Sequence, residues 1–282
     1  MPVDFPACVE REFPRVFATA WAATEAALQP LDGADLSPLA RHSPGLLGYD
    51  WRGYLRCSVA RVARVADELS RVREGGRVLD VGAYFGNFTR AAASMGFRVD
   101  ALDAFRAYGD ALRPWTAGLE AAGAKPIDFA DVGLDLHGLA DGSYDAVLVM
   151  GVLEHVPHSP RQLLRAVHRV LKPGGTIVLD TPNIAYLYNR ERLARGESIM
   201  PPLASQFDCD PPFEGHHREY TMDEVRWMLE RTAFKHVVVD AFNYSLFALE
   251  TLQGHDLELY RRMIADPTAR EVIFATARTP NA

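Results

Sequence analysis

From residue 77 onward, short apolar runs alternate with segments of helical periodicity. Five runs have the length and composition of parallel strands that are buried on both faces: Arg77–Val81, Arg98–Leu102, Lys125–Phe129, Tyr144–Met150 and Thr176–Asp180. Apolar residues at spacings of three and four predict helices at Gly86–Ser94, Phe105–Ala121, Ser159–Leu171 and Met222–Thr232. This alternation predicts right-handed crossovers and an α/β fold, a Rossmann-like, doubly wound and mostly parallel sheet.

The C-terminal part of the chain departs from this pattern. His236–Ala241 predicts a sixth strand, and Glu271–Arg278 predicts a late strand. We expect these two strands to pair antiparallel, so the sheet carries an antiparallel C-terminal strand.

The first 75 residues show no strand pattern. Apolar residues lie on one stripe of Cys8–Leu28, and a second helical repeat covers Tyr54–Val72, with Arg61 and Arg64 on its opposite face. Gly33–Gly53 is rich in Gly, Pro, Ser and Asp and predicts a loop. We therefore expect a helical N-terminal extension or cap over residues 1–75 and a second domain over 76–282. Whether the extension caps a pocket or forms a homodimer face stays open.

One long segment, residues 196–219, interrupts the second domain. It contains Pro201, Pro202, Pro211 and Pro212, and a loop of this length in a compact domain usually serves function or moves. We predict a lid on the substrate side. Thr221 and Glu224 directly after it form a capping box, which predicts the start of the next helix.

Composition narrows the possible partners. A net charge of -7 argues against a nucleic-acid partner, because phosphate binding needs a basic face. No apolar run approaches 18 residues, so we expect no membrane span. Three widely spaced cysteines argue against a structural zinc site and fit a reducing compartment. We expect a cytoplasmic protein that binds a small molecule.

A glycine-containing turn follows the first strand, in the segment Val78-Leu79-Asp80-Val81-Gly82-Ala83-Tyr84-Phe85-Gly86. Glycines let the backbone approach a ligand, and the helix start offers unpaired N–H groups. Asp103 ends the second strand, 17 residues after Gly86, where its carboxylate can accept hydrogen bonds from two ribose hydroxyls. The pattern predicts a nucleoside-containing cofactor at this edge of the sheet.

Further motifs follow in a fixed order: Phe129-Ala130-Asp131, Ser143-Tyr144-Asp145-Ala146-Val147, Val152-Leu153-Glu154-His155-Val156, Leu171-Lys172-Pro173-Gly174-Gly175, Thr181-Pro182-Asn183 and His216-x-Arg218-x-Tyr220-Thr221. Over residues 76–278 the series resembles the class I S-adenosylmethionine-dependent methyltransferases, in particular their small-molecule branch. The resemblance implies S-adenosyl-L-methionine as cofactor and S-adenosyl-L-homocysteine as product.

The same resemblance implies the cofactor contacts. Asp80, Gly82 and Gly151 would face the methionine part, and Asp103 the ribose. Ala104, Phe105, Asp131 and Val132 would surround the adenine, and Asp128 and Asp135 are the alternatives to Asp131 for this role. The implied cofactor-binding set is Asp80, Gly82, Tyr84, Gly86, Asp103, Ala104, Phe105, Asp131, Val132 and Gly151.

Tyr84 departs from the family pattern, which commonly has a glycine at this position. A bulky residue must avoid unfavourable positive φ and leave space for the amino-acid end of the cofactor. We predict ordinary dihedral angles and a ring that borders the pocket. A blocked turn would prevent cofactor binding.

The catalytic candidates are Glu154, His155 and His217. The pKa range of histidine suits His155 to a general base, and the alternative is a packed ring that shapes the pocket floor. His216 and His217 are adjacent and point opposite ways on an extended chain, so only one of them faces the site. We select His217.

Metal binding is a further alternative. Glu154, His155, His216 and His217, together with Asp208 and Asp210, offer oxygen and nitrogen ligands, and a divalent ion can acidify a hydroxyl. The sequence has no tight ligand spacing such as His-x-x-x-His here, so we predict no metal site.

Taken together, the patterns predict an S-adenosylmethionine-dependent methyltransferase that methylates an oxygen of a small-molecule or sugar-like acceptor. N- or C-methylation is the alternative within the class. Two alternatives belong to other classes: an NAD-dependent oxidoreductase and a non-catalytic cofactor-binding protein.

Overall fold

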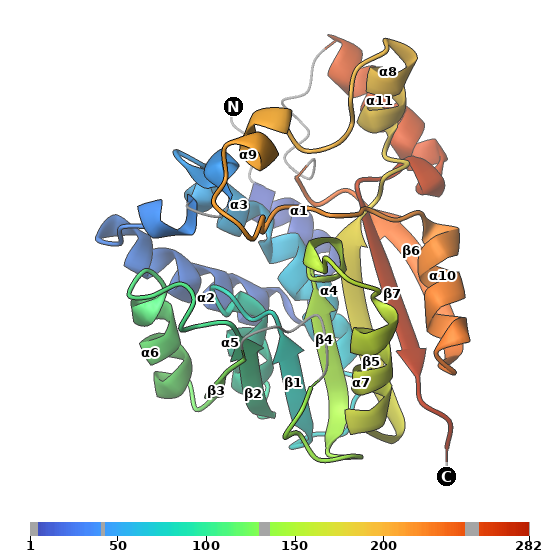
Figure 1. Cartoon of the computed structure of the whole chain (residues 1–282). Coiled ribbons are helices and arrows are strands. Elements are labelled where there is room, and N and C mark those ends of the chain that lie inside the picture. Colours follow the sequence, from blue (N-terminus) through green and yellow to red (C-terminus); the bar gives the residue numbers. More distant parts are fainter. Residues whose placement is uncertain (1–4, 41–42, 130–135, 246–253, 282) are drawn as a thin grey trace.

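A computed structural model of the chain describes residues 5–40, 43–129, 136–245 and 254–281. Seven strands in these ranges form one sheet in the order β3-β2-β1-β4-β5-β7-β6 (Figure 1). Their bounds are β1 Arg77–Val81, β2 Arg98–Asp103, β3 Lys125–Asp128, β4 Tyr144–Met150, β5 Leu171–Pro182, β6 Lys235–Phe242 and β7 Val272–Arg278. β1 to β5 pair in parallel, which confirms the predicted Rossmann-like α/β sheet.

The antiparallel pairing of β6 with β7 is also confirmed. The structure adds that β7 lies between β6 and β5 and pairs antiparallel with both. β1 and β4 are parallel neighbours, so their carboxyl ends lie side by side at one edge of the sheet, near its middle. At this point the strand order changes direction: β1, β2 and β3 extend to one side, and β4 and β5 to the other. In doubly wound folds, ligands bind beyond this edge.

Helices cover both faces of the sheet. Their bounds are α1 Phe5–Glu12, α2 Phe17–Leu28, α3 Trp51–Cys57, α4 Val59–Leu69, α5 Asn87–Ser94, α6 Arg113–Ala121, α7 Arg161–Val170, α8 Leu187–Ala194, α9 Leu203–Phe207, α10 Met222–Arg231 and α11 Gly254–Ala265. α2, α4 and α5 bury apolar side chains against one face, and α7 and α10 against the other. Neighbouring strand residues such as Val78 and Leu79 enter opposite clusters, as the two-residue period of a strand requires.

Three predicted helices have wrong bounds. Cys8–Leu28 is two helices, α1 and α2, and Pro14 lies between them, where its ring and missing N–H disfavour a continuous helix. Tyr54–Val72 is divided at Ser58, whose hydroxyl donates to the Tyr54 carbonyl at 2.8 Å. The predicted helix Phe105–Ala121 begins only at α6, because Gly109 has a φ of 57° and Pro114 favours the first turn.

Elements without a sequence signal appear on the C-terminal side. α8, α9 and α11 were not predicted, and α9 lies within the segment 196–219. Figure 1 shows this orange segment passing over the upper end of the sheet. The capping box before α10 is confirmed, since the Thr221 and Glu224 side chains each accept a hydrogen bond from the other residue's backbone N–H. Among the described residues, no helix is both long enough and apolar enough to cross a membrane.

Candidate functional site

The turn after β1 requires glycine at two positions. Gly82 has a φ of 75°, and a Cβ there would lie 2.5 Å from Cγ2 of Val152. Gly86 has a φ of 70°, and its Cβ would lie 2.3 Å from Cδ2 of Leu119. Both positions combine the left-handed region with a close approach, so any side chain would be strained and crowded. The turn thus brings bare backbone to the edge of the sheet.

Tyr84 adopts a φ of 47°, so the prediction of ordinary dihedral angles is wrong. Such a conformation costs of order 1–3 kcal/mol for a non-glycine residue and persists only where its surroundings impose it. Its N–H donates to Oδ2 of Asp103 at 2.7 Å. Its partly buried ring lies 4.4 Å from Phe85, 5.6 Å from Tyr108 and 5.8 Å from Trp51 between centroids. The hydrogen bond and this packing hold the strained backbone in place.

Asp103 is buried at the end of β2. Besides the Tyr84 N–H, it accepts hydrogen bonds at Oδ1 from the Ala104 N–H at 2.7 Å and from the Tyr108 hydroxyl at 3.1 Å. Burial raises the pKa of Asp103, and these donors pull it partly back. Tyr108 belongs to no motif, and no sequence pattern marked it. Its hydroxyl takes up one acceptor position on the Asp103 carboxylate.

Asp80 carries an unsatisfied oxygen. The side chain is fully buried, and its Oδ2 accepts from the Thr89 hydroxyl at 2.5 Å. Its Oδ1 has no hydrogen-bond partner among the described residues. Burial raises the pKa of Asp80 to about 7. A buried polar atom without a partner costs about 1–3 kcal/mol, so this oxygen suits a donor group supplied by a ligand.

Two of the remaining cofactor candidates, Gly151 and Phe105, lie among the described residues. Gly151 follows β4 with a φ of 67°, and its N–H donates to the Asp180 carbonyl at 3.1 Å. The Phe105 ring packs, partly buried, on the cluster formed with α2, α4 and α5. Asp131 and Val132 lie outside the described residues.

A buried ion pair ties the N-terminal helices to this edge. Arg61 of α4 donates from Nε and Nη2 to the two carboxylate oxygens of Asp180 on β5, both at 2.7 Å. The side chains are 7% and 0% exposed. The expectation that Arg61 lies on a polar outer face is therefore wrong. The helical period alone placed it there, and the burial comes from packing between distant segments that no local pattern records.

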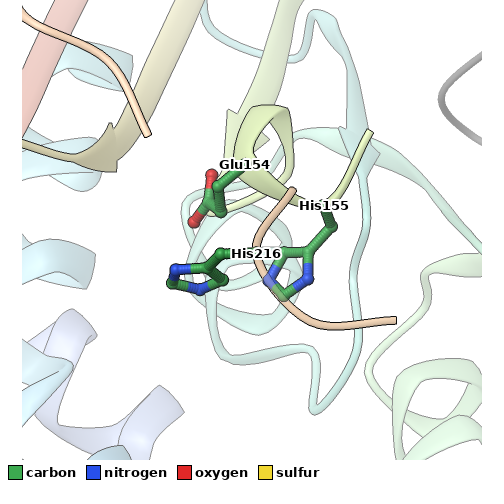
Figure 2. Close-up of side chains that lie close together, drawn as sticks. All are labelled: Glu154, His155 and His216. Atoms are coloured by element: carbon green, nitrogen blue, oxygen red, sulfur yellow. The ribbon is translucent and has the colours of Figure 1, made fainter. Parts of the chain in front are cut away.

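The three side chains in Figure 2 gather beyond β4. Glu154 and His155 come from the short 3-10 helix Leu153–His155, and His216 comes from the segment 196–219. One ligand-type atom from each lies within 4.8 Å of the other two. The buried Glu154 accepts from the Thr181 hydroxyl at 2.9 Å through Oε2. We call Glu154, His155 and His216 the Glu-His-His cluster.

Each histidine of the cluster is anchored through Nδ1. His155 Nδ1 lies 2.8 Å from the Glu214 carbonyl, and His216 Nδ1 lies 2.8 Å from Oε1 of Glu219. The two rings meet edge to face at 4.8 Å between centroids.

The cluster shifts the acidity of its own members. Burial raises the pKa of Glu154 to about 7. The His155 side chain is exposed at its surface, but protein groups surround its ring. The loss of water around the ring, and the nearby His216, lower the pKa of His155. Burial alone would lower the pKa of His216, but the hydrogen bond that its ring donates to Glu219 and the charge of Glu154 raise it overall.

His217 takes different partners from its neighbour. Its Nε2 lies 3.0 Å from the Phe213 carbonyl, and its backbone N–H donates to the Glu154 carbonyl at 2.7 Å. The structure thus brings His216, rather than His217, beside Glu154 and His155. Neither Asp208 nor Asp210 belongs to the cluster that the described residues form.

A separate cavity of about 390 Å³ opens in the N-terminal extension. Leu31, Leu36, Leu46, Leu47, Tyr49 and Trp51 are among the residues that line it. Its Trp51 also touches Tyr84, so the extension contacts the turn after β1 directly.

Comparison with known proteins gives a family match and partial relatives. The family model described as "Methyltransferase domain" matches residues 52–239. The ubiquinone biosynthesis O-methyltransferase of Xanthomonas oryzae pv. oryzae is 39% identical over 110 residues, which cover 39% of this chain and 44% of that protein. Its counterpart in Pseudomonas aeruginosa is 31% identical over 118 residues, covering 40% and 49%. The match thus spans less than half the length of these curated relatives.

Solved structures share the fold at low identity. Haemonchus contortus phosphoethanolamine N-methyltransferase 2, with phosphomonomethylethanolamine and S-adenosylhomocysteine, superposes with a TM-score of 0.55 at 16% identity, covering 78% of this chain and 52% of that one. A SAM-dependent methyltransferase from Archaeoglobus fulgidus gives 0.53 at 19% identity, covering 82% and 100%.

Proposed function

The chain belongs to the class I S-adenosylmethionine-dependent methyltransferases, and on that premise we propose that it methylates a hydroxyl oxygen of a small-molecule or sugar-like acceptor. The observation that carries the oxygen acceptor is the Glu-His-His cluster, which lies next to the edge where β1 and β4 end. The names of the partial relatives, which are O-methyltransferases, support the same choice.

The residues present fit the cofactor. The unsatisfied Oδ1 of Asp80 suits the ammonium group of the methionine part, directly or through water. Asp103 suits the ribose once the Tyr108 hydroxyl yields or shares its position on Oδ1. Gly82 and Gly86 let the chain pass close to the ligand. Bound there, S-adenosylmethionine supplies a methyl group activated by its sulfonium charge.

The other cofactor contacts remain part of the proposal. Ala104, Phe105, Asp131 and Val132 would surround the adenine, and Gly151 would contact the methionine end. A flat adenine ring needs apolar cover, and the partly buried Phe105 offers it.

The protein acts on the acceptor by orienting it and by drawing away its proton. Alignment of donor and acceptor supplies much of the rate enhancement in a displacement of this kind. The Glu-His-His cluster presents oxygen and nitrogen lone pairs to a hydroxyl, and such groups remove or polarise a proton. His217 fixes the backbone of the segment 196–219 to Glu154. We assign Glu154, His155 and His217 to the acceptor side, together with His216.

Methyl-labelled S-adenosylmethionine tests the proposal. The chain is incubated with matched hydroxyl, amine and carbon acceptors of similar size, and the products are identified by mass spectrometry. We expect O-methyl products, at a rate that falls at least tenfold in Glu154→Gln. Transfer only to amines or only to carbon would overturn the oxygen acceptor and leave the family assignment intact.

A further inference from the structure

The Glu-His-His cluster has the composition and anchoring of a metal site. We propose that Glu154, His155 and His216 bind one divalent transition-metal ion, and that this ion holds the acceptor hydroxyl. The inference rests on the proposed O-methylation and names the device that activates the hydroxyl. It also replaces the prediction that no metal site exists here.

The three ligand atoms are close enough for one ion after a small adjustment. One carboxylate oxygen of Glu154 and one ring nitrogen from each histidine, Nδ1 or Nε2, lie within 4.8 Å of one another. Ligands at roughly 2.0–2.2 Å from an ion are about 3–4 Å apart, so side-chain rotations that move these atoms by about 1 Å complete the site. Figure 2 shows the His216 ring below the Glu154 carboxylate, with the His155 ring beside it.

The hydrogen bonds of the two rings fix which nitrogen is free. The Glu214 carbonyl next to His155 is only an acceptor, so the Nδ1 of that ring carries the proton and its Nε2 keeps a lone pair. The Glu219 carboxylate accepts from Nδ1 of His216 in the same way, so Nε2 is the nitrogen of that ring that is left for an ion. Metal-binding histidines in proteins donate their other N–H in this way, to a carbonyl or carboxylate that orients the ring.

The carboxylate is oriented in a comparable manner. The Thr181 hydroxyl at the end of β5 donates to Oε2 of Glu154. The His217 N–H donates to the Glu154 carbonyl, which holds the two chain segments of the site together. Every proposed ligand therefore has a hydrogen-bond partner that fixes its direction.

The ligand types select the ion. Two imidazoles and one carboxylate suit Zn²⁺, Mn²⁺, Fe²⁺ or Co²⁺, whereas Mg²⁺ and Ca²⁺ prefer oxygen ligands. Three protein ligands leave at least one open position, as in catalytic sites. The acceptor hydroxyl fills it and becomes more acidic there.

The transfer balances with the cofactor alone. The bound hydroxyl releases its proton to water, and an oxygen lone pair forms the O–CH₃ bond. The S–CH₃ bond breaks with its electron pair left on sulfur, so the cationic sulfonium becomes neutral S-adenosylhomocysteine.

Cobalt titration of the untagged full chain tests the site directly. Co²⁺ is added to metal-free protein, and binding is followed by calorimetry and by its visible absorption, which reports coordination number. We expect one Co²⁺ per chain, displaced by Zn²⁺, and at least tenfold weaker binding in Glu154→Gln, His155→Gln and His216→Gln. The matched control His217→Gln, whose ring bonds elsewhere, keeps the wild-type affinity for Co²⁺. Thermal unfolding of each variant excludes loss of the fold as the cause.

The outcomes separate the metal site from the proposed function. Absence of Co²⁺ binding, or equal loss in His216→Gln and His217→Gln, would overturn the metal site. O-methyl transfer that continues unchanged after chelation would overturn the role of the ion in activation and leave O-methylation standing. One bound Co²⁺ with transfer only to amines would support the metal site and overturn the proposed acceptor.

Discussion

Replacing Arg61 by Met removes one partner of the buried ion pair at the end of β5. The substitution keeps an apolar chain of similar length but leaves the Asp180 carboxylate buried without its two hydrogen bonds. Breaking a buried pair by removing one partner typically costs about 3–5 kcal/mol. With roughly 2 °C of Tm per kcal/mol for a chain of this size, we expect Tm to fall by about 6–10 °C.

Two further variants identify the cause of that loss. Arg71→Met removes partly exposed pairs with Asp67 and Glu68, and such pairs contribute about 1 kcal/mol or less each, so its Tm should fall by about 4 °C at most. Adding Asp180→Asn to Arg61→Met removes the stranded charge and should recover more than half of the loss. Scanning calorimetry measures all four proteins. If Arg61→Met lowers Tm no more than Arg71→Met, or if the double variant is no more stable than Arg61→Met, the explanation by a stranded buried charge is refuted.

Three other predictions concern the cofactor edge. Asp103→Asn removes the charge but keeps one oxygen that can accept, so about one charged hydrogen bond to the ribose is lost. Such a bond contributes about 1.5–3 kcal/mol, so the Kd for S-adenosylhomocysteine should rise about tenfold to a hundredfold; an unchanged Kd would place the ribose elsewhere. Gly82→Ala should lower stability and cofactor affinity because its Cβ meets Val152, and Val152→Ala in the same chain should restore part of both, as measured by Tm and calorimetry; no rescue would count against the clash. Burial raises the pKa of Asp80 above its unfolded value to about 7, so the stability that its protonated form contributes is present below about pH 4 and lost as pH rises toward 7. Asp80→Asn should flatten that part of a Tm–pH profile. An identical slope in both proteins would contradict a raised pKa at Asp80.

The strands were predictable because each is a local apolar run. β1 and β4 agree with the predicted bounds, since both are buried on two faces and end where the hydrophobic run ends. The helix ends were harder to predict, because Pro14 and Ser58 interrupt helices whose apolar stripe continues across the break. Periodicity reports which face is buried, whereas a break depends on a single residue.

The cofactor edge was partly predictable for the same reason. Asp80, Gly82 and Asp103 end strands or form the turn between strand and helix, so chain position alone places them together. Tyr84 shows what local rules miss: its positive φ is held by the hydrogen bond to Asp103 and by aromatic rings from two other segments, Trp51 and Tyr108.

The Glu-His-His cluster and the Arg61–Asp180 pair depend on contacts between distant segments. His216 is 61 residues beyond His155 and Asp180 is 119 beyond Arg61. Side-chain alternation shows that only one of His216 and His217 can face the site. Which one does so depends on the path of a long loop, and the sequence does not give that path.

Calorimetric titration of the full chain with S-adenosylhomocysteine and, in parallel, with NAD tests the central claim most directly. We expect one S-adenosylhomocysteine per chain, weakened by Asp103→Asn, and no heat of binding with NAD. Binding of NAD, or of neither ligand, would contradict the account, because it would mean that the turn carrying Tyr84 does not accept the methyl donor.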